Sequence, residues 1–368
     1  MKIRGAVLTA AGADHPYHQS RPLSIRELDL GHPGAKELLV RIESAGLCHS
    51  DLSVVNGSRP RPLPLVLGHE AAGRVLEIGP EVTDIAVGQR VTMTFLPRCE
   101  ECAACATSGR IPCPYGASVN GAGTLLGGGV RLWDNAQPIH HHNGVSGFAT
   151  HAVVDRRSVV PVDDDVPPDV AALLGCAVLT GGGAVLNVAQ PSAGETLMVI
   201  GLGGVGMAAV LVGAASAGVR VIGVDLEQSK LAIAAGLGAT DVYTPEDVQR
   251  LGLKASHTIE AAGHPAALEL AFAATSPGGR TVTVGLPHPS ERITLPAQTI
   301  TTETRSIVGS YLGSSVPSRD IPHYVDLWRA GRLPIEKLIS SRIRLEDLND
   351  ALDALAAGSV LRQMIDFS

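Results

Sequence analysis

Between residues 196 and 285 the chain alternates short apolar runs with helical segments. The apolar runs include TLMVIG, RVIGVD and RTVTVG, and the helical segments include GMAAVLVGAASAG and SKLAIAAGLG. This alternation predicts a parallel sheet with right-handed crossovers, and therefore a doubly wound α/β domain. The uncharged stretch from Leu197 to Val219 contains several glycines. It therefore indicates a buried strand turning into a helix rather than a membrane-spanning segment.

The first half of the chain has a different pattern. From Met1 to about Cys176, short β-like runs are separated by turns that contain Gly and Pro, and no long helical pattern occurs. This pattern predicts a mostly antiparallel β domain. We expect the long, Gly-rich loop from Pro114 to Phe148 to border a functional site. A chain of 368 residues is long enough for two such domains.

Composition excludes several classes of protein. The 29 Lys+Arg and 36 Asp+Glu give a net charge of −7, and aromatic residues make up only 3%. Nucleic-acid binding is therefore disfavoured, because it needs a basic face and stacking rings. Six cysteines in so long a chain do not make a disulfide scaffold. The start, MKIRGAVLTAAGAD, indicates a first strand rather than a signal peptide, so we expect a soluble, cytoplasmic protein.

The segment GLGGVG, Gly201–Gly206, follows a predicted strand and begins a predicted helix. In a dinucleotide site Gly201 permits the tight turn, Gly203 permits close approach of a pyrophosphate, and Gly206 permits close helix packing. The next strand ends in Asp225, where an acid would bind the ribose 2′-hydroxyl and repel a 2′-phosphate. The motif therefore predicts NAD rather than NADP, with a purely structural Gly-rich turn as the alternative.

Four cysteines lie close together in the spacing C-x2-C-x2-C-x7-C: Cys99, Cys102, Cys105 and Cys113. Four thiolates on one loop can form a closed tetrahedral shell around Zn²⁺, which stabilises a loop and does no chemistry. Two disulfides would be strained at this spacing, and an iron–sulfur cluster is a further alternative. The cluster therefore predicts a metal site, with zinc as the favoured ion.

The remaining cysteines, Cys48 and Cys176, stand alone, and His69 lies between them in the segment LGHE. Two thiolates and an imidazole would leave one zinc coordination position open for water or substrate, as in alcohol dehydrogenase. A lone buried cysteine is more often a small apolar side chain. Two acids, Asp51 and Glu70, lie near these residues, and Asp51 is a candidate partner for the second nitrogen of a metal-bound His69.

Over essentially its whole length the sequence resembles zinc-dependent alcohol dehydrogenases of the medium-chain dehydrogenase/reductase superfamily. The matching segments are AGLCHSDL, LGHEAAGRV, the four-cysteine loop, IHHH with GFATHAVVD, LLGCAVLTG, GLGGVG with Asp225, and VLRQMIDF. The resemblance implies a GroES-like β domain carrying catalytic zinc in residues 1–177 and 312–368. It implies a Rossmann cofactor domain in residues 178–311.

Residue by residue, the resemblance also implies roles in the site. The residues that would bind catalytic zinc are Cys48, His69 and Cys176, and the four-cysteine loop would bind structural zinc. Ser50 would pass the alcohol proton toward the cofactor ribose, with Asp51 and Glu70 beside the metal ligands. The residues that would contact the cofactor are His49, Thr180, Gly201, Gly203, Gly204, Val205, Gly206, Asp225, Lys230 and Arg362.

Two positions depart from the family pattern. Many relatives have a histidine five residues after the first zinc-binding cysteine, which completes a proton relay, and this chain has Ser53 there. The substrate pocket would be lined by Phe95, His142 and Asn143, although relatives often have bulky apolar residues after IHH. We therefore expect either a more polar pocket or a role for His142 in proton transfer. A metal site formed by the triplet His140–His142 is disfavoured, because consecutive side chains point in different directions.

Together these features predict an NAD-dependent enzyme with two zinc ions per chain that interconverts primary or secondary alcohols and aldehydes or ketones. Two alternatives remain. One is oxidation of a thiol–formaldehyde adduct, which the lack of Lys and Arg between Cys113 and Arg131 disfavours. The other is a non-catalytic, zinc-stabilised nucleotide sensor. The resemblance implies a homodimer through the cofactor domains, with a tetramer as the alternative, and no nucleic-acid or membrane partner is expected.

Overall fold

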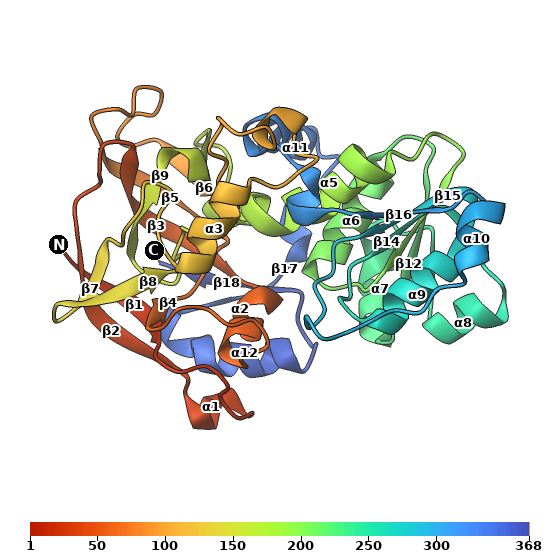
Figure 1. The fold of residues 1–368 in the computed structure, drawn as a ribbon, viewed down its shortest axis with the longest axis horizontal. Helices are drawn as coiled ribbons and strands as arrows, with labels where there is room; N and C mark the ends of the chain where they lie inside the picture. Colours follow the sequence, from red (N-terminus) through yellow and green to blue (C-terminus); the bar gives the residue numbers. More distant parts are fainter. Residues whose placement is uncertain (368) are drawn as a thin grey trace. The chain divides into compact units, whose positions relative to one another are not determined.

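The computed structural model describes residues 1–367, and the chain divides into two compact units (Figure 1). Unit 1 comprises Met1–Cys176 and the chain from Ile339 onward, and unit 2 comprises Ala177–Leu338. The chain thus returns to unit 1 at Ile339, later than the expected residue 312.

Unit 1 contains a closed barrel and a seven-stranded sheet. The barrel order is β1 (Lys2–Leu8), β2 (Leu23–Leu30), β7 (Leu132–Asp134), β8 (Gln137–His141) and β4 (Leu65–Val66). The sheet order is β10 (Val159–Val162), β6 (Arg90–Met93), β5 (Ala71–Ile78), β3 (Glu37–Leu47), β18 (Arg362–Asp366) and β17 (Ile339–Ile343), with β9 (His151–Asp155) also paired to β3. Most pairs are antiparallel, whereas β4 with β8 and β17 with β18 are parallel. The mostly antiparallel β domain is therefore confirmed.

Short helices complete unit 1: α1 (Tyr17–Ser20), α2 (His49–Val55), α3 (Pro114–Ala122), α4 (Pro168–Leu173) and α12 (Leu348–Ala356). Its main core gathers apolar side chains from several strands, including the fully buried Leu38, Leu67 and Phe148. The segment 114–148, expected as a loop, contains α3, β7 and β8. That expectation was wrong because β7 and β8 have only 3 and 5 residues and α3 contains glycines, so these elements give little periodic signal.

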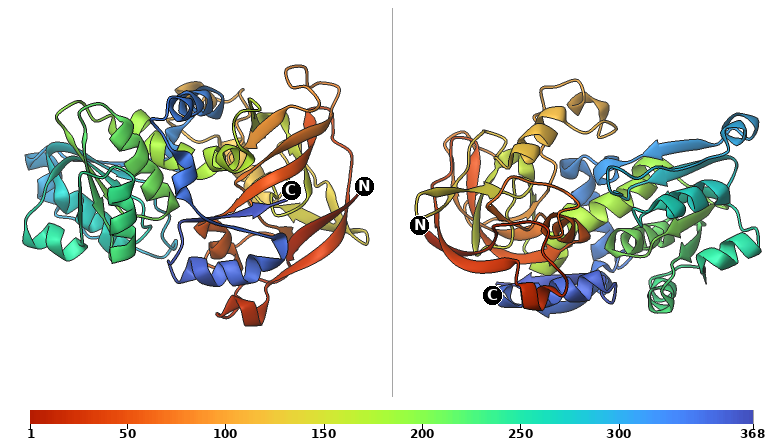
Figure 2. Two further views of the ribbon diagram at one scale, coloured as in Figure 1. Left: turned by 180° about the vertical axis from the view of Figure 1, so that it is seen from behind. Right: turned by 60° about the horizontal axis from the view of Figure 1, so that its bottom comes forward.

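Unit 2 is a six-stranded parallel sheet with helices on its flanks (Figure 2). The strand order is β13 (Asp241–Tyr243), β12 (Arg220–Val224), β11 (Thr196–Ile200), β14 (Ala255–Glu260), β15 (Thr275–Thr283) and β16 (Ser306–Gly309). Counted within the unit this is 3-2-1-4-5-6, the Rossmann order, and it confirms the predicted doubly wound domain. The helices are α5 (Leu179–Gly183), α6 (Gly204–Ala215), α7 (Gln228–Gly236), α8 (Pro245–Arg250), α9 (Pro265–Ala274), α10 (Ala297–Thr302) and α11 (Pro317–Arg329).

Packing explains why residues 312–338 stay with unit 2. Tyr324 of α11 is fully buried, and its hydroxyl would lie 2.8 Å from a Cβ placed at Gly182 of α5. Arg332 donates a hydrogen bond of 2.8 Å to the carbonyl of Ala215 at the end of α6. These contacts lie between segments far apart in the sequence, so the amphipathic pattern of α11 alone did not reveal its neighbours.

One helical run, Pro168–Ala189, is long and apolar enough to cross a membrane by length and composition. An 18-residue stretch of this run has a mean hydropathy of 1.8, but 89% of that stretch is buried inside the protein. Such burial is typical of a core helix. The run includes two π-helical segments, η3 (Leu174–Val178) and η4 (Ala184–Ala189).

Candidate functional site

Cys48 lies at the junction between a strand and a helix in unit 1. It follows β3 directly and is the N-cap of α2. Its backbone N–H donates to Oδ2 of Asp51, three residues further along, at 3.0 Å. This capping contact satisfies a backbone group at the start of the helix and orients Asp51 back toward the cysteine. Both side chains are buried, with Cys48 6% and Asp51 0% exposed.

His69 follows β4 and lies beside Cys48 and Asp51, and Gly68 directly precedes it in the chain. Gly68 has φ +91°, and a Cβ there would lie 2.5 Å from both the ring and the backbone of Phe148, so only glycine fits. Nδ1 of His69 lies 3.1 Å from Oδ1 of Asp51, and the N–H of Gly68 donates to the same oxygen at 3.3 Å. Asp51 thus fixes the tautomer in which His69 offers Nε2 as a metal ligand.

Cys176 lies in the π-helical segment η3, a form of helix common at functional sites. The preceding Gly175 packs so closely that a Cβ would lie 1.9 Å from the carbonyl oxygen of Met93. Sγ of Cys176 lies 3.5 Å from Nε2 of His69. The sequence pattern of the ligands did not identify Gly68 and Gly175, although each directly precedes a candidate ligand.

The donor atoms of Cys48, His69 and Cys176 all lie within 4.8 Å of one another. A tetrahedral zinc with bonds of about 2.3 Å to sulfur and about 2.0 Å to nitrogen separates such ligand atoms by roughly 3.5 Å. The observed separation of Cys176 and His69 matches this value. A hydrogen bond from Cys176 and the charge of Arg362 hold the pKa of Cys48 well below its usual range, which favours the thiolate a metal requires. The trio therefore fits zinc with one open position.

Glu70 and Arg362 are buried beside this trio. Nε of Arg362 lies 3.5 Å from Oε1 of Glu70, and its Nη2 lies 3.6 Å from Sγ of Cys48. Glu70 is 0% exposed, and burial raises its pKa to about 7. A Cβ at Gly46 would lie 2.7 Å from Glu70 Oε1, so the glycine makes room for this carboxylate. The cofactor contact predicted for Arg362 stays a prediction, because its guanidinium faces Glu70 and Cys48 within unit 1.

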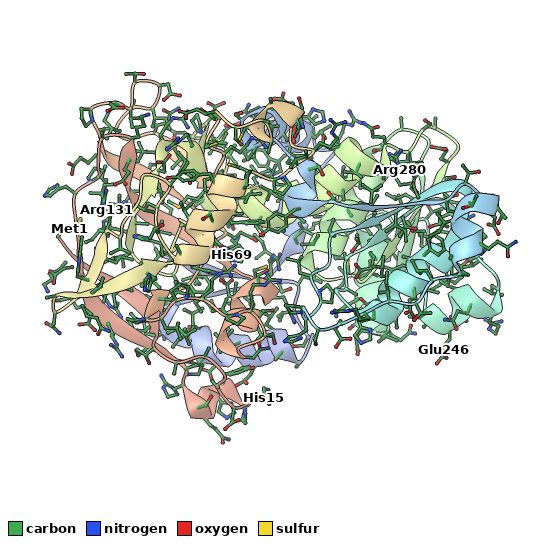
Figure 3. The ribbon with its side chains drawn as sticks, viewed as in Figure 1. Met1, His15, His69, Arg131, Glu246 and Arg280 are labelled. Carbon is green, nitrogen blue, oxygen red and sulfur yellow. The ribbon has the colours of Figure 1, made fainter. Side chains whose placement is uncertain are left out.

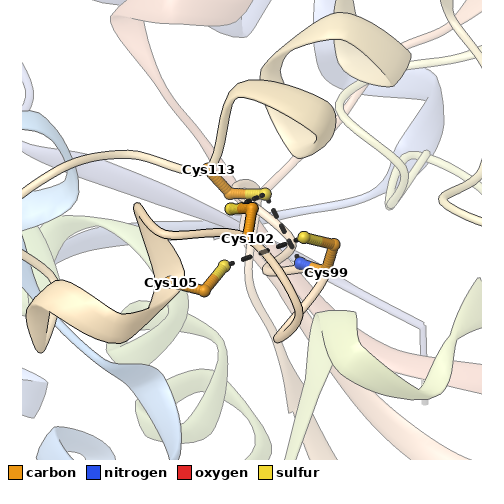
Figure 4. Close-up of side chains that lie close together, drawn as sticks. All are labelled: Cys99, Cys102, Cys105 and Cys113. Carbon is orange, nitrogen blue, oxygen red and sulfur yellow. Dashed lines mark hydrogen bonds between the residues drawn. The ribbon is translucent and has the colours of Figure 1, made fainter.

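The four thiols of the second cluster point toward a common centre (Figure 4). Cys99 and Cys105 are 4.0 Å apart at sulfur, as are Cys102 and Cys113. Two thiolates on one tetrahedral zinc lie roughly 3.8 Å apart, whereas a disulfide bond is about 2.05 Å long. Burial opposes ionisation of Cys113, yet the N–H groups of Cys99 and Gly116 lower its pKa to about 7. The cluster therefore fits a zinc site without an open position.

The glycine motif forms the turn between β11 and α6. Gly201 has φ +91°, and a Cβ there would lie 2.5 Å from the backbone of Ala262. A Cβ at Gly206 would lie 1.9 Å from the Gly201 carbonyl, so this residue sets the close packing of helix and turn. Nothing lies within 4 Å of a Cβ at Gly203, the N-cap of α6. Gly204 and Val205 form the first turn of α6, whose N–H groups suit a pyrophosphate.

Asp225 follows β12, next to this turn. Its Oδ2 accepts from the N–H of Leu202 at 2.7 Å, and its Oδ1 accepts from the N–H of Glu227 at 3.0 Å. Nζ of Lys230 lies 4.0 Å from Oδ1. The carboxylate is therefore held at the position where a Rossmann domain binds a ribose.

The remaining predicted residues have these positions. His49 is exposed and Ser50 half-buried in the first turn of α2, and Thr180 is 8% exposed on α5. The ring of Phe95 meets the ring of His69 edge to face at 5.5 Å (His69 is labelled in Figure 3). His142 is buried against Asp51, and Asn143 has φ +52° just after it. The hydroxyl of Ser53 donates to the carbonyl of His49 at 3.0 Å.

Comparison with known proteins identifies close relatives of this chain. The family model described as Alcohol dehydrogenase GroES-like domain matches residues 34–164, and the model described as Zinc-binding dehydrogenase matches residues 204–329. Alcohol dehydrogenase B of Mycobacterium tuberculosis is 32% identical over 380 residues, which cover 100% of this chain and 99% of the relative.

Solved structures agree with this relationship. The alcohol dehydrogenase zinc-binding domain protein of Burkholderia ambifaria superposes with a TM-score of 0.92 at 31% identity, covering 100% of this chain and 99% of the other. Benzyl alcohol dehydrogenase of Acinetobacter calcoaceticus superposes with a TM-score of 0.91 at 28% identity, covering 100% of both chains. The likeness therefore extends over both units.

Proposed function

Because the chain belongs to the zinc-dependent alcohol dehydrogenase family of the medium-chain dehydrogenases/reductases, we propose that it transfers a hydride between a primary or secondary alcohol and NAD. The product of oxidation would be an aldehyde or a ketone. The observation that carries this proposal is the buried trio Cys48, His69 and Cys176, whose donor atoms lie within 4.8 Å of one another. This ligand set leaves a coordination position for the substrate oxygen.

When bound, zinc would lower the pKa of the alcohol toward neutrality, and the nicotinamide would accept the hydride. The chain itself orients the ligands and moves a proton. Asp51 holds the ring of His69 and the backbone of Cys48. We assign acceptance of the alcohol proton to Ser50, which is half-buried and lies two residues after Cys48 in the first turn of α2. At the position where relatives continue a proton relay, the hydroxyl of Ser53 donates to the helix backbone at His49.

We propose NAD rather than NADP because of Asp225. Two backbone N–H groups hold its carboxylate beside the glycine turn. A fixed negative charge there repels the 2′-phosphate of NADP, whereas the 2′-hydroxyl of NAD donates a hydrogen bond to it. Lys230 forms an ion pair with Asp225 at 4.0 Å, so we assign both side chains to the adenosine ribose.

We also propose two zinc ions per chain, one in each cysteine-containing site, and a homodimer formed through the cofactor units. The dimer is supported by the position of β16 at the end of the sheet order, where a strand can pair with a second copy. A tetramer would be built from two such dimers. Solution mass measured by light scattering tests the assembly. A cytoplasmic location and the absence of nucleic-acid and membrane partners stay proposals.

The test of function is a screen of NAD and NADP reduction by purified protein, with zinc counted per chain. Aromatic alcohols are assayed first, because the Acinetobacter relative is a benzyl alcohol dehydrogenase. Short, long, branched and allylic alcohols follow, and formaldehyde is assayed with and without glutathione or mycothiol. Alcohol-dependent NADH formation is expected. Activity with formaldehyde only in the presence of a thiol, or nucleotide binding without turnover, would contradict the proposal.

A further inference from the structure

A third buried imidazole, His142, lies beside the proposed catalytic ligands without belonging to them. It directly follows β8, which pairs in parallel with β4 so that Val66 is opposite His141. His69 follows β4 by three residues. The pairing of these two strands therefore carries His142 and His69 to the same end of the barrel, although they are distant in the sequence.

His142 contacts both Asp51 and His69. Its Nδ1 lies 3.1 Å from Oδ1 of Asp51, and its ring meets that of His69 edge to face at 5.2 Å. His142 is 1% exposed, and within residues 1–367 its Nδ1 has no hydrogen-bond partner besides this contact with Asp51. One carboxylate oxygen therefore has three nitrogen neighbours, which belong to His142, His69 and the backbone of Gly68.

Because several groups share the Asp51 carboxylate, His142 can affect how this carboxylate orients His69. The two Asp51 oxygens already accept from the N–H of Cys48, the N–H of Gly68 and the ring of His69. A contact on Oδ1 limits rotation of the carboxylate and draws negative charge away from His69. Groups that orient a metal-bound imidazole in this way change metal affinity by about ten- to a hundredfold.

We propose that His142 is a positioning residue. It shares the Asp51 carboxylate with His69 and thereby fixes the orientation of His69, a ligand of the catalytic metal. The inference rests on the proposed zinc trio.

A direct ligand role is the competing interpretation. Asp51, His69 and His142 offer donor atoms within 4.8 Å of one another, so they could hold a metal themselves. However, His69 would then have to bridge two ions, because its Nε2 lies 3.5 Å from Cys176 while its Nδ1 faces Asp51. The positioning role leaves His69 with one ion.

The variants are His142→Phe, which keeps a ring but removes its nitrogens, and His142→Asn, which restores a donor. His140→Phe is the matched control, two residues earlier on β8. The measurement is metal release to a chelator with a coloured indicator. The metal of the four-cysteine site serves as the internal reference, and the visible spectrum of the cobalt-substituted protein is recorded.

In His142→Phe we expect release of one metal to be at least tenfold faster and the cobalt spectrum to shift. His142→Asn should restore both in part, and His140→Phe should match the parent. Unchanged release in His142→Phe, or equal acceleration of both metals together with a lower Tm, would overturn the positioning role. A third metal that His142→Phe loses would overturn it in favour of a ligand role. A parent protein with only the four-cysteine metal would refute the proposed zinc trio itself.

Discussion

Nε2 of His69 lies 3.5 Å from Sγ of Cys176, although 107 positions separate the two residues in the chain. Cys48, which belongs to a third segment of the chain, lies beside both residues. Bringing three segments together costs conformational entropy, and burying polar donors costs further free energy unless they are paired. A bound metal ion compensates for both, which is the physical reason to expect zinc at this point.

Metal content is the first prediction. We expect two zinc ions per chain, and six titratable thiols after zinc removal under denaturing conditions without reductant. All six cysteines are free, and the closest pairs of the four-cysteine site are 4.0 Å apart at sulfur. Elemental analysis and a thiol titration provide the measurements. Four thiols or fewer, or iron in place of zinc, would contradict the assignment.

Removing a single cysteine ligand should affect only the zinc site to which that cysteine belongs. Cys176→Ala should lower kcat at least about a hundredfold and leave about one zinc per chain, because only the open site loses a ligand. Cys102→Ala should instead lose the other zinc and lower the Tm, because that ion stabilises a loop. Activity assays, zinc analysis and thermal unfolding check both variants. Full activity in Cys176→Ala would refute the catalytic trio.

Features formed by residues close together in the sequence could be predicted, whereas contacts between distant segments could not. The glycine motif Gly201–Gly206 and the four-cysteine cluster could be recognised from the sequence, because the residues of each motif are close neighbours along the chain. The parallel pairing of β4 with β8, which carries His142 to Asp51, joins segments more than sixty positions apart. No short pattern encodes such a register, so the contact was found only in the structure.

Contacts between distant segments also explain why the sequence did not reveal the closely packed glycines or the return of the chain to unit 1 at Ile339. Gly175 is required by the carbonyl of Met93, and Gly182 by the hydroxyl of Tyr324. Each requirement comes from a distant segment. Asp225 was predictable because strand, turn and next strand are consecutive in a Rossmann domain.

The charge of Asp225 is expected to select the cofactor. Asp225→Asn keeps one of the two oxygens that accept backbone N–H groups and removes the negative charge. We expect KM for NAD to rise about tenfold, which is roughly 1.4 kcal/mol, and KM for NADP to fall or stay unchanged. Steady-state kinetics with both cofactors provide the measurement. An equal rise for the two cofactors would show that the ribose contact is not the basis of selection.

Gly175→Ala should destabilise the protein and its catalytic site. The new Cβ would lie 1.9 Å from the carbonyl oxygen of Met93, so the helix that carries Cys176 must shift. We expect a loss of about 2 kcal/mol or more, together with weaker binding of one zinc. Gly236→Ala is the control, since nothing lies within 4 Å of its Cβ on α7. That variant should be neutral or more stable by about 0.5 kcal/mol. Equal Tm values for the two variants would contradict the packing argument.

Buried His141 should make stability depend on pH. It is 1% exposed, its Nε2 accepts from the N–H of Arg131 at 3.0 Å, and burial together with the charge of Arg131 lowers its pKa to about 3. The unfolded chain, in which the histidine pKa is about 6.5, binds this proton first as the pH falls. The stabilisation is therefore present above about pH 6.5 and is lost as the pH falls toward the folded value. At pH 5 the loss amounts to about 2 kcal/mol. Urea unfolding at pH 7 and pH 5 should show this loss in the parent but not in His141→Gln, which keeps an acceptor that does not titrate. The same pH dependence in both proteins would assign the acid sensitivity to other groups, zinc release among them.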